Sequence, residues 1–185
     1  FDFIFLSKIT KGVFWVSPNK KDNILLLFLF LTVLGTVSQI TIGGITRVTG
    51  SGDGCPDWPT CFGKWLPPIE YHALIEYSHR SMGTLVGLFI LTICIRVLLK
   101  HNYNKNLVKS SLLLILLVII VGLLGGFVVL SELNPAVRTI HLMLAEITIL
   151  LSVTSLILFI DLLGVFLTHQ TQAEKYYYLI YLMGL

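Results

Sequence analysis

The sequence predicts an all-α membrane protein, a four-helix transmembrane bundle with a structured outer loop between its first and second helices. Only 12% of the 185 residues are charged and 55% are hydrophobic, whereas a soluble domain carries about 25% charged residues. The mean hydropathy of +0.86 points the same way. In addition, four apolar stretches each reach the roughly 20 residues that a helix needs to cross the hydrocarbon core of a bilayer.

Each apolar stretch is expected to be a helix, because lipid offers no partner to an unpaired backbone group and the runs are too long for barrel strands. The predicted spans are residues 24–45, 73–99, 107–130 and 136–165. They make up one transmembrane domain over residues 24–165. The final run, Tyr176–Leu185, is apolar but too short to span a bilayer. We therefore expect residues 166–185 to be a cytoplasmic tail or the start of a truncated further helix.

Basic residues assign the two faces of the membrane, since lysine and arginine concentrate in cytoplasmic loops. They gather before the first span and after the second, at Lys8, Lys11, Lys20, Lys21, Arg96, Lys100, Lys105 and Lys109. We expect a multi-pass protein of the cell membrane with a cytoplasmic N-terminus. Residues 1–23 are then a cytoplasmic or interfacial lead-in, and the loop 46–72 lies on the outer side. No basic patch with interleaved aromatics occurs on a soluble module, so no nucleic-acid partner is predicted.

The outer loop carries chemistry that a plain connector does not need. Residues 43–65 read GGITRVTGSGDGCPDWPTCFGKW, in which glycines permit tight turns, prolines stiffen the chain and tryptophans suit the membrane interface. Cys55 and Cys61 can be bridged if the loop folds back, and an oxidising outer compartment favours a disulfide. Two unpaired thiols, a metal site and a thiol pair that exchanges electrons are the alternatives.

The second span begins with ionisable residues, which are costly inside a membrane and are therefore candidates for function. Glu76 and His79 share one helix face, which Arg80, Gly83 and Gly87 extend. The two glycines predict a shallow groove that accepts either a neighbouring helix or a flat macrocycle. Glu76 is either a structural hydrogen-bonding group or an acid–base group.

A second histidine is expected at matching depth. His79 and His141 each stand about two turns inside a span that descends from the outer side. Two histidines on separate helices of a bundle can hold heme iron from both faces. Arg47, Arg80 and Arg138 come near the outer ends of spans, where guanidinium groups suit the heme carboxylates. The alternative is that each histidine makes an ordinary hydrogen bond between helices.

The motifs G-G-x-T-R-x-T-G-S-G, C-P-D-W-P-x-C and E-x-x-H-R, followed by a histidine near the start of a fourth span, resemble the heme A synthase family. The resemblance covers about residues 38–150. It implies a membrane oxidoreductase of the monooxygenase type that converts heme O to heme A for terminal oxidase assembly. Successive hydroxylations would oxidise one porphyrin methyl group to a formyl group.

The same resemblance implies roles for individual residues. Glu76 would be catalytic, and His79 and His141 would bind heme iron. Cys55 and Cys61 would match the family's disulfide pair in the outer loop. Heme b is the implied cofactor, and heme O is the implied substrate.

The family typically has two related halves, each with its own histidine pair, and this sequence shows one. We expect either a half-size form that assembles as a homo-oligomer or a missing second half. Membrane lipid, a heme O synthase and an electron donor are the other expected partners. Two further functions stay open: a non-enzymatic b-type heme-binding membrane protein, and a quinone-linked thiol–disulfide membrane protein.

Overall fold

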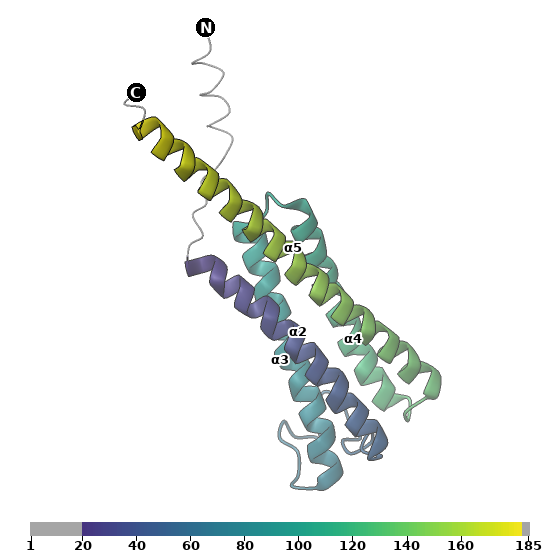
Figure 1. Cartoon of the computed structure of the whole chain (residues 1–185). Coiled ribbons are helices and arrows are strands. Elements are labelled where there is room, and N and C mark those ends of the chain that lie inside the picture. Colours follow the sequence, from purple (N-terminus) through teal and green to yellow (C-terminus); the bar gives the residue numbers. More distant parts are fainter. Residues whose placement is uncertain (1–19, 183–185) are drawn as a thin grey trace.

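The computed structural model describes the backbone of residues 20–182 and the side chains of residues 23–164. Within these residues the chain forms four α-helices and no β-strand (Figure 1). They are α2 (Lys20–Val48), α3 (Tyr71–Lys100), α4 (Lys105–Leu130) and α5 (Pro135–Leu182). Each contains a segment that is long and apolar enough to span a membrane, which confirms the predicted all-α fold with four spans. Most of the expected lead-in, residues 1–19, lies outside the described residues.

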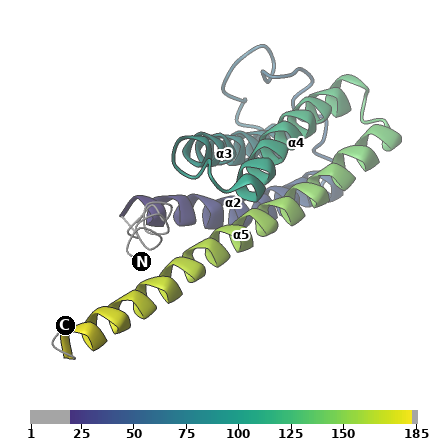
Figure 2. The same cartoon turned by 90° about the horizontal axis from the view of Figure 1, so that it is seen from above.

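The helices run alternately up and down, and each packs against two neighbours, so that α2, α3, α4 and α5 close a ring (Figures 1 and 2). The α2–α3 loop and the α4–α5 turn lie together at one end of this ring (Figure 1). We call this the loop end. The outward faces of the helices carry large exposed apolar side chains such as Leu27, Leu88 and Leu150, as expected for surfaces that meet lipid.

Close side-chain packing holds the ring together, because lipid removes the hydrophobic driving force between helices in a membrane. Toward the α3–α4 turn, the buried cluster consists of Leu25, Leu29, Ile93, Val97, Leu107 and Phe159. Nearer the middle, Gly35 of α2 lets Val86 of α3 approach so closely that an added Cβ would lie 2.9 Å from a Val86 methyl carbon. The buried hydroxyls of Ser110 and Ser155 join α4 to α5 by a 2.5 Å hydrogen bond.

Asparagines start the last two helices. Asn104 caps α4 by accepting a hydrogen bond from the Leu107 backbone N–H at 3.1 Å, and Asn134 accepts one from Ala136 N–H at 3.0 Å. Pro135 then occupies the first turn of α5, as predicted. This helix continues to Leu182, past the end expected at residue 165, because no proline or capping glycine follows Gly164 before that point.

Candidate functional site

The α2–α3 loop, residues 49–70, folds around Asp57. Its carboxylate accepts hydrogen bonds from the backbone N–H groups of Phe62 and Gly63, at 2.6 and 2.9 Å, and from the Thr60 hydroxyl. The Thr60 bond foremost, then the Gly63 bond, lowers the pKa of Asp57 below its ordinary value. The side chain therefore serves as an internal anchor for the turn that follows it.

A disulfide closes the same turn. Cys55 and Cys61 form the predicted disulfide, with an S–S distance of 2.00 Å, and both residues are 0% exposed. The loop lies directly on the first turn of α3, since a Cβ at Gly54 would be 2.4 Å from the His72 carbonyl carbon. Only glycine fits this approach of backbone to backbone. The bridge thus closes a small ring of chain that sits over α3.

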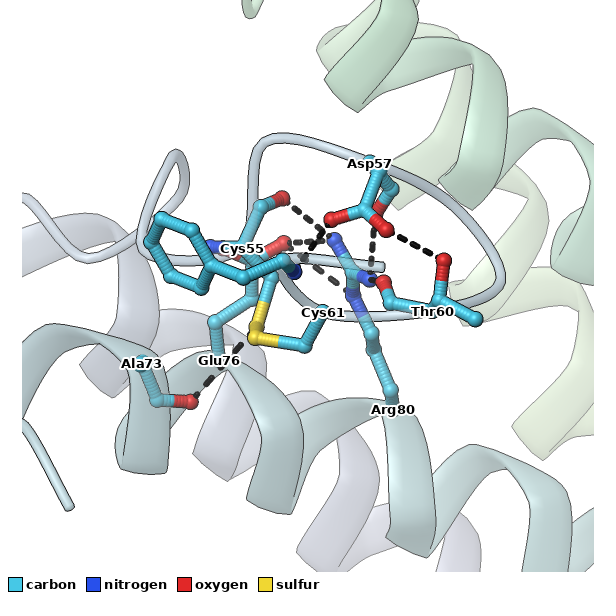
Figure 3. A network of polar contacts seen from close by, with 8 residues as sticks. Cys55, Asp57, Thr60, Cys61, Ala73, Glu76 and Arg80 are labelled. Carbon is cyan, nitrogen blue, oxygen red and sulfur yellow. Dashed lines mark hydrogen bonds and ion pairs between the residues drawn. A yellow bond between two sulfur atoms is a disulfide. The ribbon is translucent and has the colours of Figure 1, made fainter. Parts of the chain in front are cut away.

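Arg80 joins this ring to α3 (Figure 3). Its Nη1 donates to the carbonyl oxygens of Asp57 and Thr60, each at 2.7 Å, and its Nη2 donates to Cys55 O at 2.8 Å. Nε and Nη2 also donate to Glu76 Oε1, at 3.1 and 2.5 Å. A guanidinium has five N–H donors, and these five bonds use them all. The arginine expected to meet a heme carboxylate is therefore occupied by the protein itself.

Glu76, the predicted catalytic residue, lies beneath the disulfide-closed ring (Figure 3) and is 2% exposed. Its Oε2 accepts a hydrogen bond from the Cys55 backbone N–H at 2.7 Å, while Oε1 meets Arg80. An ionised carboxylate accepts about four hydrogen bonds, and this one accepts three. We call Glu76, Arg80 and the ring from Cys55 to Cys61 the clamp.

The two predicted iron ligands lie in the bundle on different helices. His79 of α3 packs on Gly43 of α2, where an added Cβ would stand 2.8 Å from the ring carbon Cε1. His141 of α5 packs on Gly125 of α4 in the same way, since an added Cβ at Gly125 would stand 3.2 Å from the His141 ring carbon Cε1. In both rings Nδ1 is buried without a hydrogen-bond partner.

The other predicted arginines lie at the loop end. Arg47 is exposed in the last turn of α2, and Arg138 is half-buried in the first turn of α5. The salt bridge in the described part of the chain is Arg80–Glu76, so neither of these two arginines forms one there. Their guanidinium groups are therefore the ones open to a carboxylate.

Sequence reasoning missed Gln39, which lies on α2 beside His79. Its Nε2 is 3.4 Å from His79 Nε2, and its Oε1 is buried without a partner. Gly83 provides the space for this amide, because an added Cβ there would lie 3.0 Å from Gln39 Nε2. The expected groove at Gly83 is therefore filled. A lone amide in the middle of an apolar span was the available signal.

Glycines of α4 also have more specific roles than general helix packing. An added Cβ at Gly126 would lie 2.7 Å from the Trp58 indole, so the loop reaches across to α4. Gly125 leaves room for His141, as described above. Among the described residues, no three histidine, cysteine or acidic side chains converge on one point. The histidine pair is the remaining candidate for a ligand site among these residues.

Fold and site define a class: a multi-pass helical membrane protein with two histidines in its bundle, each packed on a glycine and each with an unpaired ring nitrogen. Unpaired imidazoles with small residues beside them fit a heme. The chain belongs to the cytochrome oxidase assembly protein family, COX15-CtaA, whose model matches residues 26–74 and 69–184.

Curated relatives agree with this assignment. Heme A synthase of Alkalihalophilus pseudofirmus is 31% identical over 62% of this chain and 39% of that protein. Heme A synthase of Halalkalibacterium halodurans is 31% identical over 66% of this chain and 42% of its own length. Heme A synthase of Ehrlichia ruminantium, strain Gardel, is 28% identical over 69% of this chain and 46% of its own length. The chain thus spans less than half the length of these relatives.

Proposed function

We propose that this chain acts in heme A synthesis, as an oxidoreductase that oxidises a methyl group of heme O to a formyl group for terminal oxidase assembly. The observation that carries the proposal is the pair of buried, unpartnered nitrogens on His79 and His141, set in a chain of this family. An unpaired polar group costs about 1–3 kcal/mol when buried. Two such groups, one on α3 and one on α5, would be accounted for by a ligand that binds both.

His79 and His141 would hold the iron, and Gly43 and Gly125 keep space beside the two rings. Arg47 and Arg138 would pair with the propionate carboxylates at the loop end. Bound heme b supplies the redox-active iron, and heme O is the substrate. In this proposal Arg80 fixes the loop and Glu76 in place and does not bind a heme carboxylate, because its donors are already used by them.

Glu76 is the proposed acid–base residue. The clamp fixes its carboxylate from two sides, through Arg80 and through the Cys55 N–H, and leaves about one acceptor position. A group held in this way is positioned before substrate arrives, which is how catalytic side chains gain efficiency. The disulfide-closed ring then belongs to the catalytic apparatus.

The basic residues that flank the spans support a cytoplasmic N-terminus and a loop end on the outer side of the cell membrane. The relatives are more than twice as long as the matched part of this chain. A second, equivalent set of helices would then come from another copy of the chain or from a second half. A heme O synthase would deliver the substrate, and a separate donor would supply electrons.

The test is expression of this chain in cells that make heme O but lack heme A synthase, followed by heme extraction. Heme A is expected, and a visible spectrum of the purified protein should show bound heme. Replacing His79 or His141 by Ala should remove that heme. Absence of heme A, under conditions where a full-length relative produces it, rejects the activity.

A non-enzymatic b-type heme protein is the second candidate, and the clamp favours it by giving Glu76 a structural task. Glu76→Gln separates the two functions because the amide keeps the shape and an acceptor oxygen. Lost turnover with heme retained supports the enzyme, whereas unchanged turnover supports the second candidate. A quinone-linked thiol–disulfide function is disfavoured, since the sulfurs of Cys55 and Cys61 lie in fully buried residues.

A further inference from the structure

An open groove with a volume of about 380 Å³ lies along the first turns of α4, at the end of the bundle opposite the loop end (Figure 1). The α3–α4 turn and one face of α4 line it, and the lining includes Asn102, Lys105, Lys109, Leu112, Leu113 and Leu116. The heme site and the clamp use none of these residues. The groove is therefore a second feature of the molecule that requires an explanation.

Lysines stand at the outer end of the groove, and leucines continue it toward the middle of the membrane. Lys105, Lys109, Leu112 and Leu116 follow one another at steps of four, three and four residues, so they form one stripe on α4. All four side chains are exposed. At 1.5 Å per residue the stripe is about 16 Å long, which is about half of the 30 Å hydrocarbon core. The stripe thus has a cationic end and an apolar length that match one leaflet.

The positive charge of the groove has no acidic counterpart nearby in the chain. No aspartate or glutamate occurs in residues 77–131, which hold Lys100, Lys105 and Lys109. The salt bridge within the described residues lies in the clamp, so neither groove lysine has an acidic partner there. Asp161 of α5 does not line the groove. An anionic group from outside the chain would therefore meet two uncompensated ammonium groups.

A second copy of this chain fits the groove poorly. In a two-fold dimer about an axis along the membrane normal, each residue at the contact meets the same residue of the partner copy at the same height. The lysines of the two copies would then oppose each other, and like charges placed against one another disfavour an interface. A lipid with an anionic headgroup reverses the sign of this interaction.

We propose that the groove binds an anionic phospholipid, with the phosphate between Lys105 and Lys109 and an acyl chain along Leu112 and Leu116. Lysine binds phosphate as a point charge, and the Asn102 amide can donate a hydrogen bond to a phosphate oxygen. Basic side chains at the end of a span attract anionic lipids. The heme site plays no part in this inference.

The experiment measures thermal unfolding of the purified chain in neutral detergent micelles with added phosphatidylglycerol, phosphatidylcholine or inorganic phosphate. Phosphatidylglycerol should raise the midpoint, because a ligand that binds the folded state stabilises it, and the other two should not. In the variant with Lys105→Gln and Lys109→Gln, affinity for phosphatidylglycerol should fall by about 30-fold. Native mass spectrometry should show the bound lipid on wild type and its loss in the variant.

The matched control carries Lys64→Gln and Lys100→Gln, which remove the same charge from exposed positions outside the groove. It should respond to phosphatidylglycerol like wild type. Lys109→Gln alone, at an exposed helix position, replaces the double variant if that fails to fold. Equal responses of the groove variant and the control overturn the inference. So does a response to phosphatidylcholine or free phosphate that equals the response to phosphatidylglycerol, or a lipid-independent dimer that the groove variant loses.

Discussion

Two polar regions sit next to one another on α3 and differ in how completely their hydrogen bonds are satisfied. In the clamp, all five N–H donors of Arg80 have acceptors, and three bonds reach the carboxylate of Glu76. One helical turn away, His79 and its neighbour Gln39 share one long contact and leave an atom each unpaired. His141 also has an unpaired nitrogen.

The difference separates groups whose hydrogen bonds are satisfied within the protein from groups whose hydrogen bonds are not. Buried polar groups in native proteins almost always have partners, and those that lack them require an explanation. The polar groups of the clamp are satisfied by the loop that they hold, apart from about one acceptor position on Glu76. In the proposed function, a bound heme would account for the unpaired nitrogens of the two histidines. Four predictions test this contrast, from the largest expected effect on stability to the smallest.

Replacing Arg80 by Met should destabilise the protein most, by about 3 kcal/mol or more, because it leaves the buried carboxylate of Glu76 without its cation. The carbonyl oxygens of Cys55, Asp57 and Thr60 would lose their donor as well. Unfolding in mixed detergent micelles measures the change. Arg96→Met, toward the other end of α3, is the control and should stay near wild type. Equal effects of the two variants would mean that the clamp contributes no special stability.

Removing the disulfide with Cys55→Ala and Cys61→Ala together should cost about 2 kcal/mol, as expected for closure of a short loop. The remaining bonds to Arg80 keep part of the loop in place, so the effect should be smaller than that of Arg80→Met. Thermal unfolding with and without a reductant checks it. Reductant should lower the stability of wild type and leave the double variant unchanged. A double variant as stable as wild type would show that hydrogen bonds alone hold the loop.

Replacing His79 and Gln39 together by Leu should act in the opposite direction on the ligand-free protein. It removes both side chains of one long contact and the two buried atoms that have no partner, and apolar replacement of both partners is neutral or stabilising, here by up to about 1 kcal/mol. Heme binding should be lost at the same time. Unfolding of the heme-free protein and a visible spectrum measure the two effects. Strong destabilisation of the heme-free variant would place His79 among the structural groups and remove the contrast.

The sequence predicted the helices well because their signal is the length of apolar runs, which depends on no partner. It also predicted the disulfide, since Cys55 and Cys61 are close in sequence. The task of Arg80 was beyond sequence reasoning, because its acceptors are backbone carbonyls that carry no sequence signal. Gln39 was missed for a related reason. Its contact with His79 depends on the pairing of α2 with α3, and that pairing is set by packing.

Asp57 gives the smallest expected effect and the one that depends on pH. Its pKa lies below the ordinary value of 3.8, chiefly through the Thr60 hydroxyl and then the Gly63 N–H. The stabilisation is therefore present above that ordinary value and disappears as the pH falls through the lower pKa of the folded state, below about pH 4. Hydrogen exchange at the amides of Phe62 and Gly63 should rise in that range. In Asp57→Asn the exchange should no longer change with protonation, beyond its intrinsic pH dependence. If wild type and variant respond alike to acid, the turn is held by the disulfide and by Arg80 without help from this carboxylate.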